Sequence, residues 1–280
     1  MFTRTLTVLF ALAAFATVGM ATAAAEDKLP PGANDAKARL EKSPRHGEFV
    51  DIAVPDMKVP LKTYVVYPES KEKAPVVLVI HEIFGLSDWV RAVADQLAAD
   101  GFIAVAPDFI SGMGPNGGGT ESVASVDDVR KLVSGMKEDE VVKRLNAARD
   151  YGMNLPASNK KTASIGFCWG GKQSFAYAVA QPELSAAVVY YGASPENAGD
   201  YAKIKAPVLG LYGSDDNRVN PTIEPAKAAM KEGGKSYTPH IYEGAGHGFL
   251  RQQDGQNGAN MKAAQQAWPE TVNFLREHTK

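Results

Sequence analysis

Cysteine is almost absent from this 280-residue sequence, which contains one, Cys168. A single thiol cannot form an internal disulfide, so the folded chain must be stabilised by its core. With 45% hydrophobic residues, the sequence can bury a substantial core, in one α/β domain or in two smaller domains. The lone cysteine is therefore either a small buried hydrophobe or a reactive group, and its neighbours in the sequence must decide between them.

An excess of charge of one sign is also missing. The 30 basic and 32 acidic residues nearly cancel. Such a balance gives no strongly positive surface for nucleic acid or anionic lipid. We therefore predict a small-molecule partner and no nucleic acid, and the sequence leaves the oligomeric state open.

Ligand-binding motifs for metals and cofactors are lacking as well. No His, Cys and carboxylate residues are grouped at metal-ligand spacing, and no phosphate or flavin motif occurs. The glycine-rich stretch 111–120, SGMGPNGGGT, has no Lys-Ser/Thr ending of a phosphate-binding loop. We expect no metal and no cofactor, and we interpret 111–120 as a flexible loop that could border a binding cleft.

Long hydrophobic runs are confined to the N-terminus. One positive charge at Arg4 precedes an apolar run, and small residues then allow cleavage after Ala23 or Ala25. This pattern predicts a signal peptide over residues 1–25, a periplasmic or secreted protein, and no stable membrane insertion after cleavage. Residues 26–46 are expected to form a loosely attached arm, and residues 47–280 the folded domain.

Apolar runs and helical patterns alternate through that domain. Strands alternating with helices are typical of a mostly parallel sheet with helices on both faces, so we predict an α/β fold with about eight strands. The expected strands are 48–54, 61–67, 75–80, 102–106, 162–165, 186–190, 207–212 and 236–242, and the expected helices are 89–99, 126–153, 172–180, 225–231 and 259–277.

The cysteine lies in the stretch GFCWGG, between a predicted strand and a predicted helix. This matches the Gly-x-nucleophile-x-Gly turn, in which a strand leads directly into a helix and places the nucleophile above the sheet. Gly166 and Gly170 leave room for the strained backbone. The following helix N-terminus favours a thiolate and can hold an oxyanion, so Cys168 is predicted to be a nucleophile.

Suitable partners follow in the order nucleophile, acid, histidine. Asp215 and Asp216 come after one late strand and His247 comes after the next, flanked by glycines. At the carboxyl ends of adjacent strands, His247 could act as general base and an aspartate could orient it. The residues alone leave open which of the two aspartates does so.

Four separated pieces together resemble the dienelactone hydrolase (carboxymethylenebutenolidase) family of the α/β-hydrolase superfamily. They are His81 to Gly85 (HEIFG), Ala106 to Asp108 (APD), the GFCWGG turn, and the pair formed by 213–219 and 247–251. The resemblance spans roughly residues 47–277. It implies a carboxylic ester hydrolase with a Cys168, Asp216 and His247 triad that hydrolyses esters or lactones through an acyl-enzyme thioester.

The same resemblance assigns further residues. Glu82 matches a glutamate that holds the resting thiol and swings away when substrate binds. The backbone N–H groups of Ile83 and Trp169 match the oxyanion hole, and Arg251 matches an arginine that binds the substrate carboxylate. His81, just before Glu82, is not assigned by the resemblance and could tune the pKa of that glutamate.

One departure keeps other functions open. The family enzyme that opens dienelactone has a second carboxylate-binding arginine shortly after its Pro-Asp, whereas 109–112 here is FISG. A broader periplasmic carboxylesterase or thioesterase is therefore one alternative. A non-catalytic protein that binds acidic ligands on the same fold is another. The sequence does not identify the natural substrate.

Overall fold

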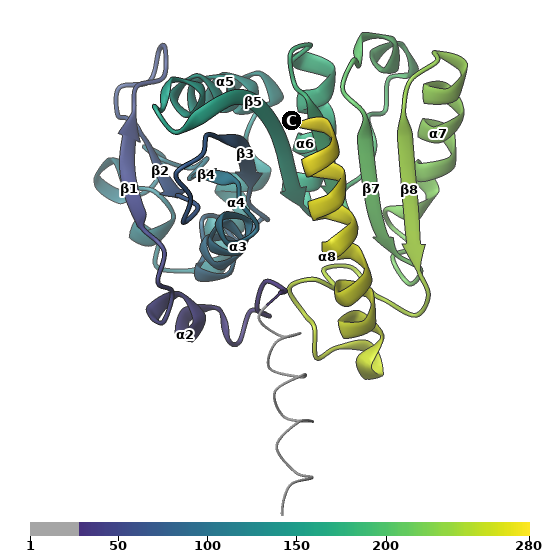
Figure 1. Ribbon diagram of the computed structural model, residues 1–280, viewed down its shortest axis with the longest axis horizontal. Coiled ribbons are helices and arrows are strands. Elements are labelled where there is room, and N and C mark those ends of the chain that lie inside the picture. The colour runs from purple at the N-terminus through teal and green to yellow at the C-terminus, as the bar shows by residue number, and fades with distance from the viewer. Residues whose placement is uncertain (1–27) are drawn as a thin grey trace, which may run out of the picture.

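The computed structural model describes residues 28–280, which fold around an eight-stranded sheet (Figure 1). The predicted signal peptide lies outside the described residues. The strands are β1 (Gly47–Ile52), β2 (Leu61–Val66), β3 (Ala74–Ile80), β4 (Ile103–Pro107), β5 (Ser158–Phe167), β6 (Ala186–Tyr190), β7 (Val208–Gly213) and β8 (Tyr237–Tyr242). Their order across the sheet is β1-β2-β4-β3-β5-β6-β7-β8. β2 is antiparallel to both β1 and β4, and the strands from β4 to β8 are parallel.

Helices cover both faces of the sheet, because successive strand side chains point to opposite faces. Val77 and Val79 of β3 join one hydrophobic cluster with α3 (Asp88–Ala99) and α8 (Ala259–His278). Figure 1 shows α8 crossing that face of the sheet. Val76 and Leu78 join the opposite cluster. The helices on this second face are α4 (Val126–Ser134), α5 (Glu138–Asn154), α6 (Trp169–Ala180) and α7 (Ile223–Glu232).

This arrangement confirms the predicted α/β-hydrolase architecture, with two differences in the elements. The predicted helix 126–153 is two helices, because the chain turns at Gly135 and resumes helical geometry at Glu138. β5 begins at Ser158, earlier than predicted, because polar residues near its start hide the strand pattern that becomes apolar only from Thr162.

The N-terminal arm is attached to the domain, so the loose attachment expected from its polar sequence is wrong for the described part. It contains α2 (Ala36–Glu41). The backbone N–H of Ala33 donates to the carbonyl of Arg251 at 2.9 Å, and the buried Gln253 side chain donates to the carbonyl of Pro30 at 2.9 Å. The arm therefore holds the loop that carries Arg251.

The order of the strands places the chemistry at one edge. β3 pairs with β4 on one side and β5 on the other, so the direction of chain winding reverses between β3 and β5. In open α/β sheets, ligands bind beyond the carboxyl ends of the strands at such a reversal. Glu82 follows β3 and Cys168 follows β5, so both lie at this point.

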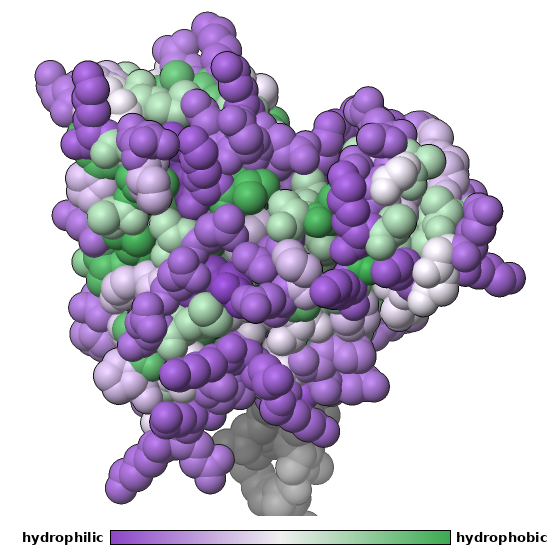
Figure 2. All heavy atoms as spheres, turned by 90° about the horizontal axis from the view of Figure 1, so that it is seen from above, coloured by the Kyte–Doolittle hydropathy of each residue, from purple (hydrophilic) through white to green (hydrophobic). Residues whose placement is uncertain are grey.

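Among the described residues, the exposed large hydrophobic side chains are Phe49, Met113, Val126 and Ile241. Hydrophilic residues predominate on the face seen in Figure 2, and the hydrophobic ones lie in separate patches. No helix within residues 28–280 is both long enough and apolar enough to span a membrane.

Candidate active site

The turn that holds Cys168 has the strained geometry expected of a nucleophile between strand and helix. Cys168 has φ 57° and ψ −113° and directly precedes α6. A Cβ at Gly166 would lie 1.9 Å from the carbonyl oxygen of Gly170, and a Cβ at Gly170 would lie 2.3 Å from that of Ile80. Only glycine fits at both positions, as the sequence predicted. The backbone strain therefore falls on Cys168, the residue whose thiol the turn exposes to the substrate side of the sheet.

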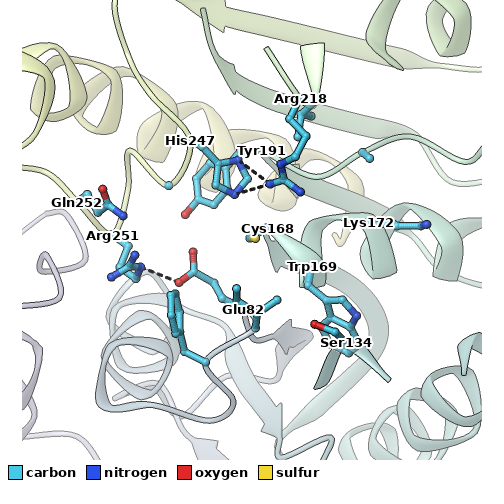
Figure 3. Close-up of a pocket in the computed structure, with 15 residues that line it drawn as sticks. Glu82, Ser134, Cys168, Trp169, Lys172, Tyr191, Arg218, His247, Arg251 and Gln252 are labelled. Carbon is cyan, nitrogen blue, oxygen red and sulfur yellow. Dashed lines mark hydrogen bonds and ion pairs between the residues drawn. The ribbon is translucent and has the colours of Figure 1, made fainter. Parts of the chain in front are cut away.

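The thiol faces a cavity of about 490 Å³ at the carboxyl edge of the sheet (Figure 3). Cys168 itself is half-buried. The cavity is lined by Glu82, Ile83, Phe84, Ser134, Cys168, Trp169, Lys172, Tyr191, Ala193, Arg218, Val219, His247, Gly248, Arg251 and Gln252. Six of the seven predicted site residues therefore meet around one space, although they come from three separate segments of the chain, and the seventh, Asp216, lies behind His247.

His247 is held by Asp216. Its Nδ1 lies 2.5 Å from Oδ2 of Asp216, whose side chain is buried. Asp215 is exposed, and its carboxylate accepts a hydrogen bond from the Ser214 hydroxyl at 3.2 Å. The aspartate that contacts the histidine is thus Asp216, and its neighbour faces away.

The contacts of His247 favour its charged form. Burial lowers its pKa, but the hydrogen bonds with the Asp216 carboxylate and with Cys168, together with their negative charge, raise the pKa of His247 to about 9. The shift therefore favours a protonated ring whenever Cys168 is a thiolate. The positive charge of a protonated ring would in turn stabilise a thiolate at Cys168.

Glu82 is a buried carboxylate paired with Arg251. Its Oε2 lies 2.8 Å from Nε of Arg251, and its side chain is only 3% exposed. The pair is an ion pair without an aligned hydrogen bond, since that Nε has no hydrogen-bond partner. Burial raises the pKa of Glu82 to about 7, although the charges of Arg251 and His247 oppose the shift. The group can therefore gain or lose a proton near neutral pH.

The described residues show no hydrogen bond between Glu82 and Cys168. The resemblance predicts that this glutamate holds the resting thiol, but here its partner is Arg251. The guanidinium of Arg251 also lies over the ring of Phe84, 4.6 Å from its centroid. The residue expected to bind a substrate carboxylate thus already has an anionic partner.

Two backbone N–H groups in the cavity are free to donate. Ile83 follows Glu82 after β3, and Trp169 is the first residue of α6. Within residues 28–280, neither backbone N–H makes a hydrogen bond. One donor lies directly after Cys168 and the other in the loop after β3, which is the arrangement expected for an oxyanion hole.

His81 links the loops around this pair of donors. Its Nδ1 lies 2.7 Å from the carbonyl oxygen of Glu82, which can only accept, and its Nε2 accepts from the N–H of Phe109 at 3.2 Å. These contacts require a neutral ring, and burial lowers the pKa of His81 accordingly. Its ring also stacks on Trp169, with centroids 5.6 Å apart. His81 therefore fixes the position of the Glu82 loop and adds no charge to it.

The glycine-rich loop is held away from the cavity. The Asp108 carboxylate accepts from the backbone N–H of Thr120 at 2.6 Å and from its hydroxyl at 2.8 Å. The same hydroxyl accepts from the N–H of Leu86 at 3.0 Å. None of residues 111–120 lines the cavity that Cys168 faces, whereas Thr120 lines a second cavity of about 250 Å³ beside Asp108. Asp108 folds this loop over the outside of the Glu82 loop instead.

Among the cavity residues that sequence reasoning missed are two that contact His247. Tyr191 has φ 40°, is fully buried, and its hydroxyl has no partner within the described chain. Its ring lies edge-on to that of His247, with centroids 5.1 Å apart. Arg218 approaches His247 from the other side, with one guanidinium nitrogen 3.2 Å from Nε2. The only signal in the sequence for Arg218 is its place two residues after Asp216 in the same turn.

An eight-stranded sheet of this order, with helices on both faces and a strained turn between β5 and α6, has the α/β-hydrolase fold. The model of the "Dienelactone hydrolase family" matches residues 61–279. The chain therefore belongs to the dienelactone hydrolase family and is an enzyme of a hydrolase family that acts on esters and lactones.

Individual relatives agree with this membership. A Yersinia pestis protein named "Putative carboxymethylenebutenolidase" is 28% identical over 240 residues, which cover 81% of this chain and 88% of that protein. A dienelactone hydrolase-like promiscuous phosphotriesterase from metagenomic libraries has a structure with a TM-score of 0.69 and 26% identity, covering 84% of this chain and 99% of the other. The structure of a "Putative Dienelactone Hydrolase" from Klebsiella pneumoniae has a TM-score of 0.71 at 23% identity, covering 83% and 99%, which supports the fold.

Proposed function

We propose that the chain is a cysteine-dependent hydrolase of esters or lactones with a Cys168, His247 and Asp216 triad. The observation that carries the proposal is the position of Cys168. Its strained turn faces a cavity that also holds a histidine, and that histidine is paired with a buried aspartate. This combination of strain, basic partner and orienting acid serves nucleophilic catalysis.

The reaction proceeds in two halves. The Cys168 thiolate attacks the acyl carbon, and the N–H groups of Ile83 and Trp169 hold the tetrahedral oxyanion. The intermediate collapses to a thioester on Cys168 as the His247 imidazolium donates its proton to the leaving oxygen. The neutral ring then takes a proton from water, which attacks the thioester, and the carboxylic acid leaves as the Cys168 thiolate and the His247 imidazolium are restored.

Glu82 controls the thiol in this proposal. While it is paired with Arg251, the carboxylate is held in its buried position. A substrate carboxylate would compete for Arg251, and the displaced Glu82 could then accept the thiol proton, since its pKa of about 7 suits proton exchange at neutral pH. A thiolate formed only with substrate present would also be better protected from oxidation.

A broader carboxylesterase is the second candidate function. It is favoured by the absence of an arginine from 109–112 and by the glycine-rich loop lying outside the cavity. Such an enzyme would accept neutral esters and would need no carboxylate on its substrate. Non-catalytic binding of an acidic ligand would leave the strained turn without a use.

Hydrolysis of dienelactone beside a neutral p-nitrophenyl ester tests these readings, with the mature protein under reducing conditions and Cys168→Ala as the control. We expect turnover of dienelactone that the variant loses. A thioester trapped on Cys168 at low pH and detected by mass spectrometry would support the covalent step. Cleavage of the neutral ester alone would move the function to the broader esterase, and no turnover of either would favour a binding protein.

Export is part of the proposal. The N-terminal pattern of a positive charge, an apolar run and small residues supports a signal peptide over residues 1–25 and a periplasmic or secreted enzyme. Cell fractionation and N-terminal sequencing of the mature protein test it. A first residue of Ala24 or Glu26 is expected, and a cytoplasmic protein that starts at Met1 would contradict it.

A further inference from the structure

The loop between β3 and α3 carries one of the two N–H groups that would hold the oxyanion, that of Ile83. The other, that of Trp169, is placed by the strained turn itself, because Trp169 directly follows Cys168 and begins α6. Residues 81–87 belong to no helix or strand. The position of the Ile83 N–H therefore depends on the contacts that hold this loop.

Side chains hold the backbone of the loop at both ends. At one end, Nδ1 of His81 lies 2.7 Å from the carbonyl oxygen of Glu82. At the other end, the N–H of Leu86 donates to the hydroxyl of Thr120 at 3.0 Å. Ile83 lies between these two anchors, so its N–H can keep one position only while both contacts persist.

Thr120 is itself fixed by a buried carboxylate. Its hydroxyl donates to Oδ1 of Asp108 at 2.8 Å, and its backbone N–H donates to Oδ2 at 2.6 Å. Asp108 is buried and directly follows β4, the neighbour of β3 in the sheet. The hydroxyl thus gives its proton to Asp108 and offers a lone pair to Leu86. These hydrogen bonds connect the end of β4 with the loop after β3.

Close packing at two glycines shows how tightly Thr120 lies against the loop. Gly85 has φ 70°, and a Cβ there would lie 2.2 Å from the hydroxyl oxygen of Thr120 and 2.7 Å from its methyl carbon. A Cβ at Gly119 would lie 2.2 Å from Oδ2 of Asp108. The contact therefore needs a glycine in each of the two loops, and a loosely placed surface loop would need neither.

We propose that Thr120 is a positioning residue for the oxyanion hole, because through Leu86 it fixes the loop that presents the N–H of Ile83. The inference rests on the proposed hydrolase function. It gives the glycine-rich stretch 111–120 a role in the reaction from outside the cavity. An oxyanion donor contributes in the transition state, so a displaced Ile83 N–H would slow the chemical steps more than it weakens substrate binding.

Thr120→Val tests the proposal, because valine keeps the shape of the side chain and replaces the hydroxyl by a methyl group. We expect kcat to fall about tenfold, less than the roughly 10²- to 10³-fold cost of losing a donor outright, and KM to change less than about twofold. The substrate is whichever of dienelactone and the p-nitrophenyl ester the wild type hydrolyses. Thr120→Ser keeps the hydroxyl and should retain most of the activity.

Ser122→Ala is the matched control. It removes a hydroxyl from the same part of the chain, but that hydroxyl donates to the carbonyl of Gly119 at 2.7 Å and not to the loop after β3. Its kcat and KM should equal those of the wild type. Thr120→Ala, which removes the hydroxyl and fills less space, provides the same comparison if valine prevents folding.

Addition of trifluoroacetophenone to Cys168 probes the oxyanion hole without turnover. The thiolate adds to the carbonyl carbon, the C=O electron pair moves to the oxygen, and no group leaves, so the affinity reports how well the oxyanion is held. Thr120→Val should bind this ketone about tenfold more weakly than the wild type does. It should bind the corresponding alcohol, which cannot add the thiol, equally well. Alkylation of Cys168 by iodoacetamide, in which the sulfur displaces iodide, should keep its rate and pH profile.

The outcomes separate this inference from the hydrolase function. Unchanged kcat and ketone affinity in Thr120→Val, or equal losses in Ser122→Ala, would overturn the inference and leave the hydrolase proposal in place. A changed alkylation rate of Cys168 would do the same, because the substitution would then have disturbed the nucleophile as well. A wild type that neither hydrolyses an ester nor adds the ketone would overturn the hydrolase proposal and this inference with it.

Discussion

Nε of Arg251 lies 2.8 Å from Oε2 of Glu82, and the Glu82 side chain is only 3% exposed. The two residues come from the loops after β8 and β3, so the pair joins two loops that line the cavity. The cation lowers the energy of the buried carboxylate without removing the cost of burial, and the pKa of Glu82 remains raised to about 7. The charged form of Glu82, close to the thiol, is therefore unfavourable in the folded protein.

Because the charged form of Glu82 is unfavourable, Glu82→Gln should become more stable relative to the wild type as pH rises. The folded pKa of about 7 lies above the usual 4.5, so the wild type loses stability as pH rises from about 4.5 to 7, while the neutral amide does not. The free energy of unfolding of the variant relative to the wild type should therefore increase by about 3 kcal/mol between pH 4 and pH 8. Urea unfolding at both pH values measures it. A pH-independent difference would show that the carboxylate is not raised.

Asp216→Asn should lower the pKa of His247 and impair catalysis. The carboxylate that raises this pKa to about 9 would be replaced by a neutral amide, which can also donate to Nδ1 and so stabilise the wrong tautomer of the ring. We expect kcat to fall by about 10²- to 10⁴-fold. Titration of the His247 ring by NMR and steady-state kinetics measure the two effects. Asp215→Asn is the adjacent control and should change neither, and equal effects of both substitutions would contradict the assignment.

The raised pKa of His247 also affects stability at high pH. Because its folded pKa of about 9 exceeds the usual 6.5, the charged ring stabilises the fold fully below pH 6.5, and this contribution is lost as pH rises to 9. Partial exposure reduces the value, to about 2 kcal/mol. Unfolding of the wild type and of His247→Gln at pH 6 and pH 9.5 should show the difference between them narrowing. A constant difference would mean that the ring is neutral in the folded protein.

Gly166→Ala should prevent the nucleophile turn from forming. The new Cβ would lie 1.9 Å from the Gly170 carbonyl oxygen, which is backbone and cannot rotate away. We expect a loss of at least about 3 kcal/mol and no esterase activity. Gly233→Ala is the control, because its φ is −77° and its nearest contact would be 3.4 Å. Thermal unfolding compares the two, and a stable, active Gly166→Ala would show that the turn is less crowded than described.

Gln253→Leu should loosen the N-terminal arm. The buried amide donates to the carbonyls of Pro30 at 2.9 Å and of Leu250 at 3.0 Å, and leucine would leave both acceptors unsatisfied. A loss of about 1–3 kcal/mol is expected, with faster proteolysis before residue 46. Gln265→Leu, at an exposed position on α8, is the control. Equal protease resistance of the two variants would mean that other contacts hold the arm.

The sequence alone predicted the sheet and the nucleophile because both depend on local patterns. β-branched runs such as 75–80 form strands almost regardless of their surroundings, and the glycines around Cys168 follow from the space that one turn needs. The break at Gly135 between α4 and α5 was missed, since one glycine in a helical pattern only weakens it. The attached arm was missed because its contacts join segments far apart in the sequence: Pro30 accepts from Gln253, and Leu29 and Ala36 are buried in the core of the domain.

What the sequence determined by itself was the order of strands and helices, the strained position of Cys168 and the supply of His247 and an aspartate after later strands. Only the tertiary structure decided that Asp216 and not Asp215 meets the histidine, that Glu82 pairs with Arg251, and that Arg218 faces the cavity. Backbone strain arises within a few residues and can be deduced from them. Charge pairs form between loops that are distant in the sequence, and folding alone brings these together.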